Sequence, residues 1–206
     1  MFTYCLNNPC NYADYNGMCS HTAHAPWLGT DCANCVVNYD VPSYSQDNFA
    51  ICWAVSEIMV EDYYDGKTQS HDAALRDAIQ LAVAVNGINE WNQGGYPTNC
   101  AAYSKAGLPL IAVGVDSIES LALYLRKNGP MYAVYKANNP NEAGKHGYHM
   151  VVITGANAVE GLVYTNNPWG KSGYQTYDQF LNGFLNMKNS NPYKLVCYIP
   201  AQGGSL

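Results

Sequence analysis

The first clear pattern along the chain is helical. Apolar residues recur three to four positions apart from Ile51 and Val55 onward, which predicts a helix over about residues 52–64. Further apolar and aromatic side chains fill much of its other side, so we expect this helix to be buried nearly all round. Glu57 and Glu61, one turn apart, are expected to mark its only solvent-facing edge.

Later segments divide into helices and strands. Helical spacing with capping residues predicts further helices, and after Pro130 β-branched and aromatic runs predict strands. The predicted helices cover 72–85, 98–106 and 117–127, and the predicted strands cover 131–135, 148–154, 162–165 and 194–199. Because helices precede strands, we predict an α+β fold with a helical lobe over about 41–128 and a β-rich lobe over 129–200.

Composition narrows the class of protein. The chain has 206 residues, which suits one large domain or two small lobes. Its 48% hydrophobic and 13% charged residues exclude a largely disordered chain. Lys and Arg total only 10 against 16 Asp and Glu, and no apolar run approaches the roughly 18 residues of a membrane span. We therefore expect neither a nucleic-acid partner nor a membrane, and we expect a monomer without a cofactor.

Residues 1–40 differ from the rest of the chain. Most of the eight cysteines lie in this segment, which has almost no apolar periodicity (Cys5, Cys10, Cys19, Cys32 and Cys35). Disulfides, free thiols, or a structural zinc with Cys32 and Cys35 as weak candidate ligands all stay open as explanations. So many cysteines favour secretion or delivery outside the producing cell, although the sequence begins without a signal peptide. We expect the arm to pack on the main body or cover its cleft, and 201–206 to be a flexible tail.

Cys52 is the first candidate for chemistry. It stands at the start of the buried helix, where backbone N–H groups stabilise an anion and lower the pKa of a thiol. Taken alone, it is as well explained as a small buried side chain. A nucleophilic cysteine also needs a base, and His149 opens the apolar strand that follows it. His146 lies three residues earlier in a Gly-flanked turn and is the weaker candidate.

Two amides complete the candidate site. Asn167 follows the strand expected to pair beside His149, where an amide holds the second ring nitrogen and sets the tautomer. Asn166 competes with it for this role. Gln46 lies on the loop that leads into the helix, six residues before Cys52, where its amide can serve as a donor to an oxyanion.

These residues form a pattern that resembles the papain-like cysteine peptidases. The resemblance rests on Gln46, the pair Cys52-Trp53, His149 before an apolar strand, and Asn167-Pro168-Trp169-Gly170, and it covers about residues 41–200. The phrase VPSYSQDNFAICWAVSEIMV looks most like the bacterial branch, which includes double-glycine leader peptidases and papain-like effector proteases of plant pathogens.

The resemblance implies a fold and a role for each residue. The active site would lie in the cleft between the two lobes, with Cys52 as nucleophile and His149 as general base and acid. Asn167 would orient His149, Gln46 would help form the oxyanion hole, and Trp169 would shield the His–Asn hydrogen bond from water. The residues before Cys52 differ from those of papain itself, so papain's substrate preference is not carried over.

Three functions stay open at this point. The first is a cysteine peptidase that acts on a protein or peptide through an acyl-enzyme. The second keeps the triad and changes the acceptor, as in a transpeptidase, deamidase or acyltransferase. The third is a papain-like binding module without activity, which the presence of all the site residues disfavours.

Overall fold

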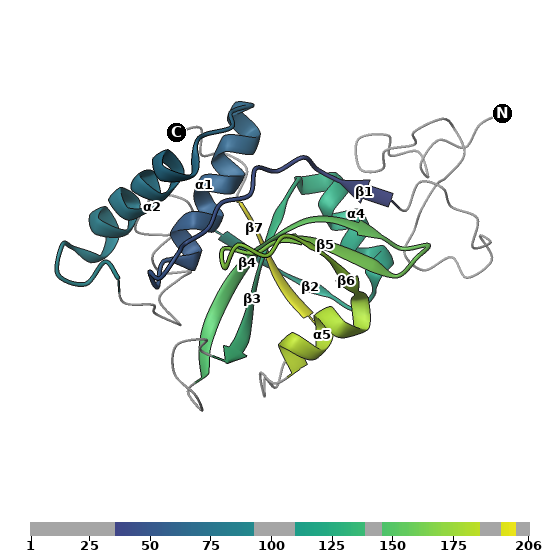
Figure 1. Cartoon of the computed structure of the whole chain (residues 1–206). Helices are drawn as coiled ribbons and strands as arrows, with labels where there is room; N and C mark the ends of the chain where they lie inside the picture. Colours follow the sequence, from purple (N-terminus) through teal and green to yellow (C-terminus); the bar gives the residue numbers. More distant parts are fainter. Residues whose placement is uncertain (1–35, 93–109, 139–145, 186–194, 201–206) are drawn as a thin grey trace.

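The computed structural model describes residues 36–92, 110–138, 146–185 and 195–200 (Figure 1). The helices in these ranges are α1 (Cys52–Asp65), α2 (His71–Asn86), α4 (Ile118–Asn128) and α5 (Tyr177–Leu185). The strands are β1 (Val36–Asn38), β2 (Leu110–Val115), β3 (Met131–Asn138), β4 (His146–Asn157), β5 (Leu162–Asn166), β6 (Gly173–Thr176) and β7 (Leu195–Pro200). None of these helices is long and apolar enough to cross a bilayer.

The described strands form one antiparallel sheet. Its order is β2-β7-β3-β4-β5-β6, and β1 pairs with the far end of β4. The β4–β5 pairing places Val152 opposite Asn166 and Ile153 opposite Thr165, so the residues that follow β5 run beside His149. Helices combined with an antiparallel sheet confirm the predicted α+β class.

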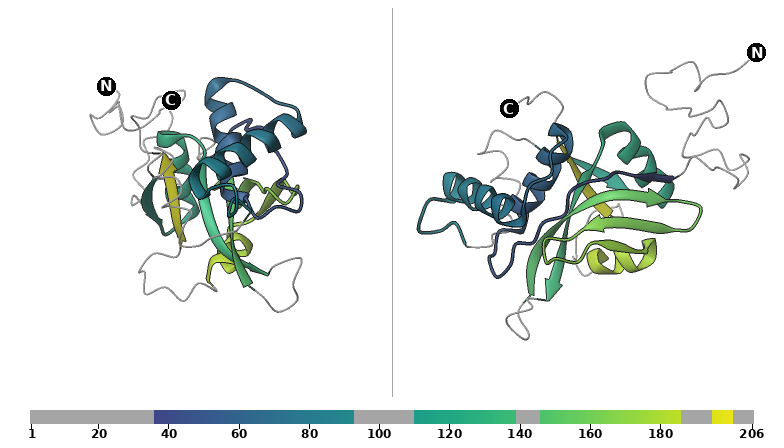
Figure 2. Two further views of the ribbon diagram at one scale, coloured as in Figure 1. Left: turned by 90° about the vertical axis from the view of Figure 1, so that its left-hand side faces the viewer. Right: turned by 45° about the horizontal axis from the view of Figure 1, so that its top comes forward.

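Side chains alternate between the two faces of the sheet. On β4, Met150 and Val152 join a buried cluster with residues of α1 and α2, whereas Val151 and Ile153 join a second cluster with residues of α4 and α5. This is the two-residue period of a strand that is covered on both faces. Figure 2 shows α1 and α2 on one side of the sheet and α5 on the other. Both clusters exclude water from the strand that carries His149.

Most of the predicted elements are present. Helices α1, α2 and α4 and strands β3, β4, β5 and β7 match their predicted ranges to within a few residues. Strands β1, β2 and β6 and helix α5 were not predicted. The predicted helix over 98–106, Cys32 and Cys35, and the tail over 201–206 lie outside the described residues. The division of the chain into lobes at residue 128 stays a prediction; β2 and α4, which precede it, both contact strands of the sheet.

The prediction that Glu57 faces solvent on α1 is wrong. Glu57 is only 7% exposed, and its Oε2 accepts a hydrogen bond of 2.6 Å from the hydroxyl of Tyr132 on β3. Glu61 is half-buried, and burial, followed by the charges of Asp65 and Asp62, raises the pKa of its carboxyl. The error arises because α1 lies against the sheet, so a polar residue that breaks the apolar pattern faces a partner rather than solvent.

Candidate active site

Cys52 is the first residue of α1 and a buried free thiol. Its Sγ accepts the backbone N–H of Met150 at 3.5 Å, which places the sulfur beside the residue that follows His149 on β4. Burial raises the pKa of the thiol, and the N–H groups of Met150, Trp53 and Cys52 itself oppose this effect. The prediction that the helix start lowers the pKa is therefore wrong in its net direction, because burial penalises the thiolate more than these donors stabilise it.

His149 lies on β4 with only 2% of its surface exposed. Its Nε2 is 2.7 Å from Oδ1 of Asn167. The backbone N–H of Trp169 also donates to this Oδ1, at 2.9 Å, which identifies the atom as the amide oxygen. An amide oxygen only accepts, so Nε2 carries the proton and Nδ1 of the neutral ring is the acceptor.

Burial lowers the pKa of His149 to about 4, and the hydrogen bond to Asn167 opposes this shift. Burial therefore favours the neutral ring at His149 and the protonated thiol at Cys52. A neutral imidazole with an Nδ1 lone pair has the chemistry of a general base.

The turn after β5 presents Asn167 and Trp169 to the histidine. The rings of Trp169 and His149 stack with their centroids 3.7 Å apart and their planes 17° apart. The N–H of Gly170 donates to the carbonyl of Asn167 at 2.9 Å and closes the turn, in which Gly170 has a φ of 74°. Trp169 therefore covers one face of the imidazole. The turn holds Oδ1 of Asn167 within hydrogen-bond distance of Nε2.

Asn166 does not compete with Asn167 at the histidine. Its Nδ2 donates instead to the carbonyls of Val41, at 2.7 Å, and Pro42, at 3.2 Å. Asn166 therefore ties the end of β5 to the segment that leads toward Gln46. The structure places the amide of Asn167 on the ring of His149, and it places Cys52 Sγ against the N–H of Met150, the next residue on β4.

Gln46 is buried on the loop before α1. Its backbone N–H donates to the carbonyl of Pro168 at 2.6 Å, which fixes the loop to the turn that carries Asn167. Its Nε2 donates to the carbonyl of Phe49, and its Oε1 is buried without a hydrogen-bond partner. A side-chain amide has two N–H groups, so Nε2 keeps a second donor for a substrate oxygen.

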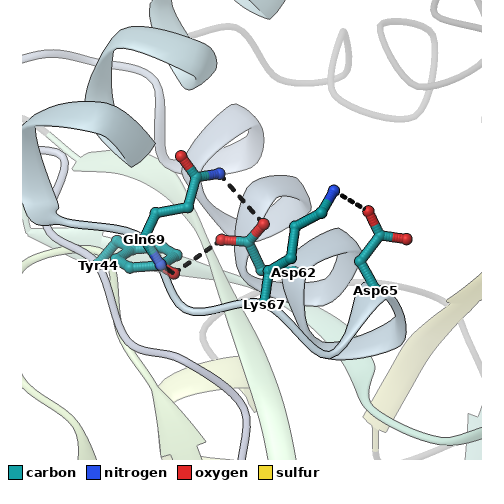
Figure 3. A network of polar contacts seen from close by, with 5 residues as sticks. All are labelled: Tyr44, Asp62, Asp65, Lys67 and Gln69. Atoms are coloured by element: carbon teal, nitrogen blue, oxygen red, sulfur yellow. Dashed lines mark hydrogen bonds and ion pairs between the residues drawn. The ribbon is translucent and has the colours of Figure 1, made fainter.

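A polar network behind this loop was missed by sequence reasoning (Figure 3). The hydroxyl of Tyr44 donates to Oδ2 of Asp62 at 2.7 Å and accepts the backbone N–H of Gln69 at 2.8 Å. No motif marks these residues, because they lie 18 and 25 positions apart in the chain. Within the described ranges no group of three His, Cys, Asp or Glu residues is arranged to hold a metal ion.

Several solved structures are similar to this fold. A putative C39-like peptidase from Bacillus anthracis has a TM-score of 0.51 at 16% identity, over 80% of this chain and 96% of that one. A double glycine motif protease from an AMS/PCAT transporter, in complex with its leader peptide, has a TM-score of 0.48 at 18% identity, over 80% and 93% of the two chains. Xylellain, a cysteine protease from Xylella fastidiosa, has a TM-score of 0.41 at 15% identity, over 80% and 85%.

The amino-acid sequence itself matches a family model. No similar sequence was found among curated proteins. The model described as papain-like cysteine protease AvrRpt2 matches residues 35–184, which include Gln46, Cys52, His149 and Asn167. The match spans well over half of the chain and agrees with the fold. The chain therefore belongs to the AvrRpt2 family of papain-like cysteine proteases.

Proposed function

We propose that the protein cleaves peptide bonds through an acyl-enzyme on Cys52, with His149 as general base and acid and Asn167 as the residue that orients His149. The observation that carries this proposal is the 2.7 Å hydrogen bond between Nε2 of His149 and Oδ1 of Asn167. It sets the tautomer in which Nδ1 can accept a proton, on a ring that adjoins the residue in contact with Cys52 Sγ.

In the first half of the reaction, Sγ of Cys52 attacks the carbonyl carbon of the scissile bond and its proton passes to Nδ1 of His149. The imidazolium keeps its hydrogen bond to Asn167, which favours the charged ring. His149 then gives the proton to the leaving amine, the C–N bond breaks, and a thioester remains on Cys52. General acid–base catalysis of this kind contributes about 10²- to 10⁴-fold to a rate.

The tetrahedral intermediate needs donors for its oxyanion. The backbone N–H of Cys52 and the second N–H of the Gln46 amide are the donors that this site offers. Removing one donor of an oxyanion hole typically lowers kcat by about 10²- to 10³-fold. Support for Gln46 comes from its burial and from its attachment to Pro168, beside the turn that carries Asn167.

In the second half, His149 takes a proton from water, whose oxygen attacks the thioester carbonyl. The new carboxylic acid leaves, and Cys52 recovers its proton from His149. All atoms balance with water as the only co-reactant, so this cycle uses no cofactor. Stacking of Trp169 on His149 supports its proposed role as a shield of the His–Asn hydrogen bond from water.

The substrate is a protein or peptide, as for other cysteine proteases of this fold. We propose that the chain acts as a monomer and that it is secreted or delivered outside the producing cell, as a bacterial effector. The cysteine content supports this location. Size-exclusion chromatography with light scattering tests the first point. Immunodetection in culture supernatant, with a cytosolic marker as control, tests the second.

The catalytic proposal is tested by comparing the wild type with Cys52→Ala and His149→Ala on a peptide library. Both variants are expected to lose cleavage, and the wild type alone should gain one adduct of an epoxide inhibitor of papain-type enzymes by intact mass. Cleavage that persists in Cys52→Ala would contradict the assignment of the nucleophile. Ammonia release from glutamine substrates, without new peptide termini, would favour a deamidase instead.

A further inference from the structure

The loop that carries Gln46 is held at several points along its length. We call residues 41–46 the strap. Its first two carbonyls accept hydrogen bonds from Nδ2 of Asn166, at the end of β5. Its last residue, Gln46, donates its backbone N–H to the carbonyl of Pro168 at 2.6 Å. Between these points the strap is attached to α1 through the side chain of Tyr44, which is buried.

Tyr44 joins the strap to the end of α1 and to the turn that follows it (Figure 3). Its hydroxyl donates to Oδ2 of Asp62 and accepts the backbone N–H of Gln69, so both functions of the hydroxyl are used. The other carboxylate oxygen of Asp62, Oδ1, accepts Nε2 of Gln69 at 3.1 Å. Three side chains from three segments therefore close one network, in which the Tyr44–Asp62 bond is buried and the bonds to Gln69 are partly buried.

The turn after α1 is shaped to complete this network. Gly66 ends α1 with a φ of 64°, in the left-handed region that favours glycine. The N–H of Lys67 then donates to the carbonyl of Asp62 at 2.8 Å, and the chain returns toward the strap at Gln69. Burial, together with the hydrogen bond and charge of Asp62, raises the pKa of Tyr44 to about 12, although the N–H of Gln69 opposes the shift. The phenol therefore stays a donor across the working range of pH.

Hydrogen bonds to other segments do not set the position of the buried Gln46 side chain among the described residues. Within the described part of the chain, its Nε2 donates to the carbonyl of Phe49, three residues away on the same loop, and its Oε1 is buried without a hydrogen-bond partner. The direction of the amide therefore depends on where the strap backbone lies. Tyr44 is two residues from Gln46 and is the strap side chain that reaches α1, the helix that begins with Cys52.

We propose that Tyr44 is a positioning residue for the reaction: held by Asp62 and Gln69, it fixes the strap so that the Gln46 amide points at the oxyanion formed over Cys52. This inference rests on the proposed role of Gln46 as an oxyanion donor. It assigns a catalytic purpose to a network whose hydrogen bonds join Tyr44, Asp62 and Gln69 and include neither the thiol nor the imidazole.

The test is a double-mutant cycle with Tyr44→Phe and Gln46→Ala, measured as kcat and KM on a cleaved peptide. Misplacement of a catalytic group by about 1 Å can cost about 10²-fold, so we expect Tyr44→Phe to lower kcat about 10- to 100-fold with KM changed less than about threefold. In the Gln46→Ala background, Tyr44→Phe should lower kcat by less than about twofold, because the donor it positions is absent.

Two further measurements separate positioning from general loosening of the fold. Alkylation of Cys52 by iodoacetamide forms no oxyanion, so its rate should stay within about twofold of the wild type in Tyr44→Phe. The matched control is Tyr39→Phe, which removes another phenol hydroxyl, one that donates to the carbonyl of Leu125 at 2.9 Å. Tyr39→Phe is expected to change kcat by less than about twofold, since its hydroxyl lies outside the strap network.

Hydrogen exchange of the Gln46 backbone N–H gives a readout that does not depend on turnover. Its protection should fall about tenfold or more in Tyr44→Phe and stay unchanged in Tyr39→Phe, because a freed strap breaks its bond to Pro168. Equal losses of kcat from Tyr44→Phe in both backgrounds, or unchanged protection, would overturn the proposal. If Gln46→Ala keeps full activity, the oxyanion role of Gln46 and the purpose assigned to Tyr44 both fall. If the wild type cleaves no peptide while protection still falls, the peptidase proposal fails and the attachment of the strap stands.

Discussion

The protonation state of His149 has a consequence for stability that can be measured. Burial lowers its pKa from an ordinary 6.5 to about 4 in the folded protein. A lowered pKa means that folding favours the neutral ring. The contribution of His149 to the unfolding free energy is therefore fully present above pH 6.5 and is lost as the pH falls through 4. We therefore expect acid to destabilise the wild type more than a variant that lacks this ring.

The size of the effect follows from the two pKa values. Each pKa unit corresponds to about 1.4 kcal/mol, so the fall from 6.5 to about 4 removes about 3 kcal/mol of unfolding free energy between pH 7 and pH 4. A domain of this size is stable by about 5–15 kcal/mol, so the loss is a large fraction of the total. His149→Gln cannot titrate and serves as the reference.

The assay is urea unfolding of both proteins at pH 7, 6, 5 and 4. Every other titratable group is common to the two, so the difference in unfolding free energy isolates His149. We expect the advantage of the wild type over His149→Gln to shrink by about 3 kcal/mol on going to pH 4. Nuclear magnetic resonance titration of the ring gives the pKa directly.

A result of opposite sign would refute this reasoning. If His149 rested as an imidazolium paired with a Cys52 thiolate, its folded pKa would lie above 6.5, and the wild type would gain on the variant as the pH fell. The experiment therefore distinguishes a neutral resting pair, which burial favours here, from an ion pair. The answer decides whether Cys52 is activated before the substrate arrives or only with it.

Four further substitutions test single contacts and the space around two glycines. Asn167→Ala removes the acceptor for Nε2 and is expected to lower kcat by at least about tenfold, with KM nearly unchanged, in steady-state peptide hydrolysis; an unchanged kcat would exclude an orienting role. Tyr132→Phe removes the donor to Glu57 and should cost about 1–3 kcal/mol in urea unfolding, whereas a neutral result would mean that the carboxyl finds another donor. Gly155→Ala sets a Cβ 2.8 Å from a backbone Cα of β1 and should cost about 1–3 kcal/mol. Gly66→Ala meets no atom within 4 Å and carries only the left-handed backbone penalty of about 1 kcal/mol; equal losses would contradict the steric argument.

The helices and strands that were predicted from sequence share regular patterns of apolar residues. Helix α1 and strands β3, β4 and β5 carry apolar side chains at the spacing of their class, and this periodicity is a local property of the chain. The elements missed are short or poorly buried. Strand β1 has three residues, and β6 is largely exposed, so neither shows an apolar pattern that separates a strand from a loop. They become strands by pairing with β4 and β5.

The candidate residues were found from sequence through their spacing and chemistry, and the resemblance implied that Asn167 orients His149. Asn166 and Asn167 are adjacent and have the same side chain, so residue type does not distinguish them. The Trp-Gly pair after them favoured Asn167, and the structure shows the partner of each: Asn167 is bonded to His149, and Asn166 is bonded to the strap. Likewise, the N-terminal position of Cys52 on α1 suggested a lowered pKa, whereas burial between helix and sheet raises it.

The amino-acid sequence by itself determined the α+β class, the main helices and strands, and the set of residues that resembles a cysteine peptidase site, because these depend on local periodicity and on residue type. The tertiary structure alone decided that Asn166 is bonded to the strap, that Glu57 is buried, that burial shifts the pKa values of the thiol and the imidazole toward their neutral forms, and that Tyr44 attaches the strap to α1. Each of these depends on distances and water exclusion between segments far apart in the chain, which no local pattern encodes.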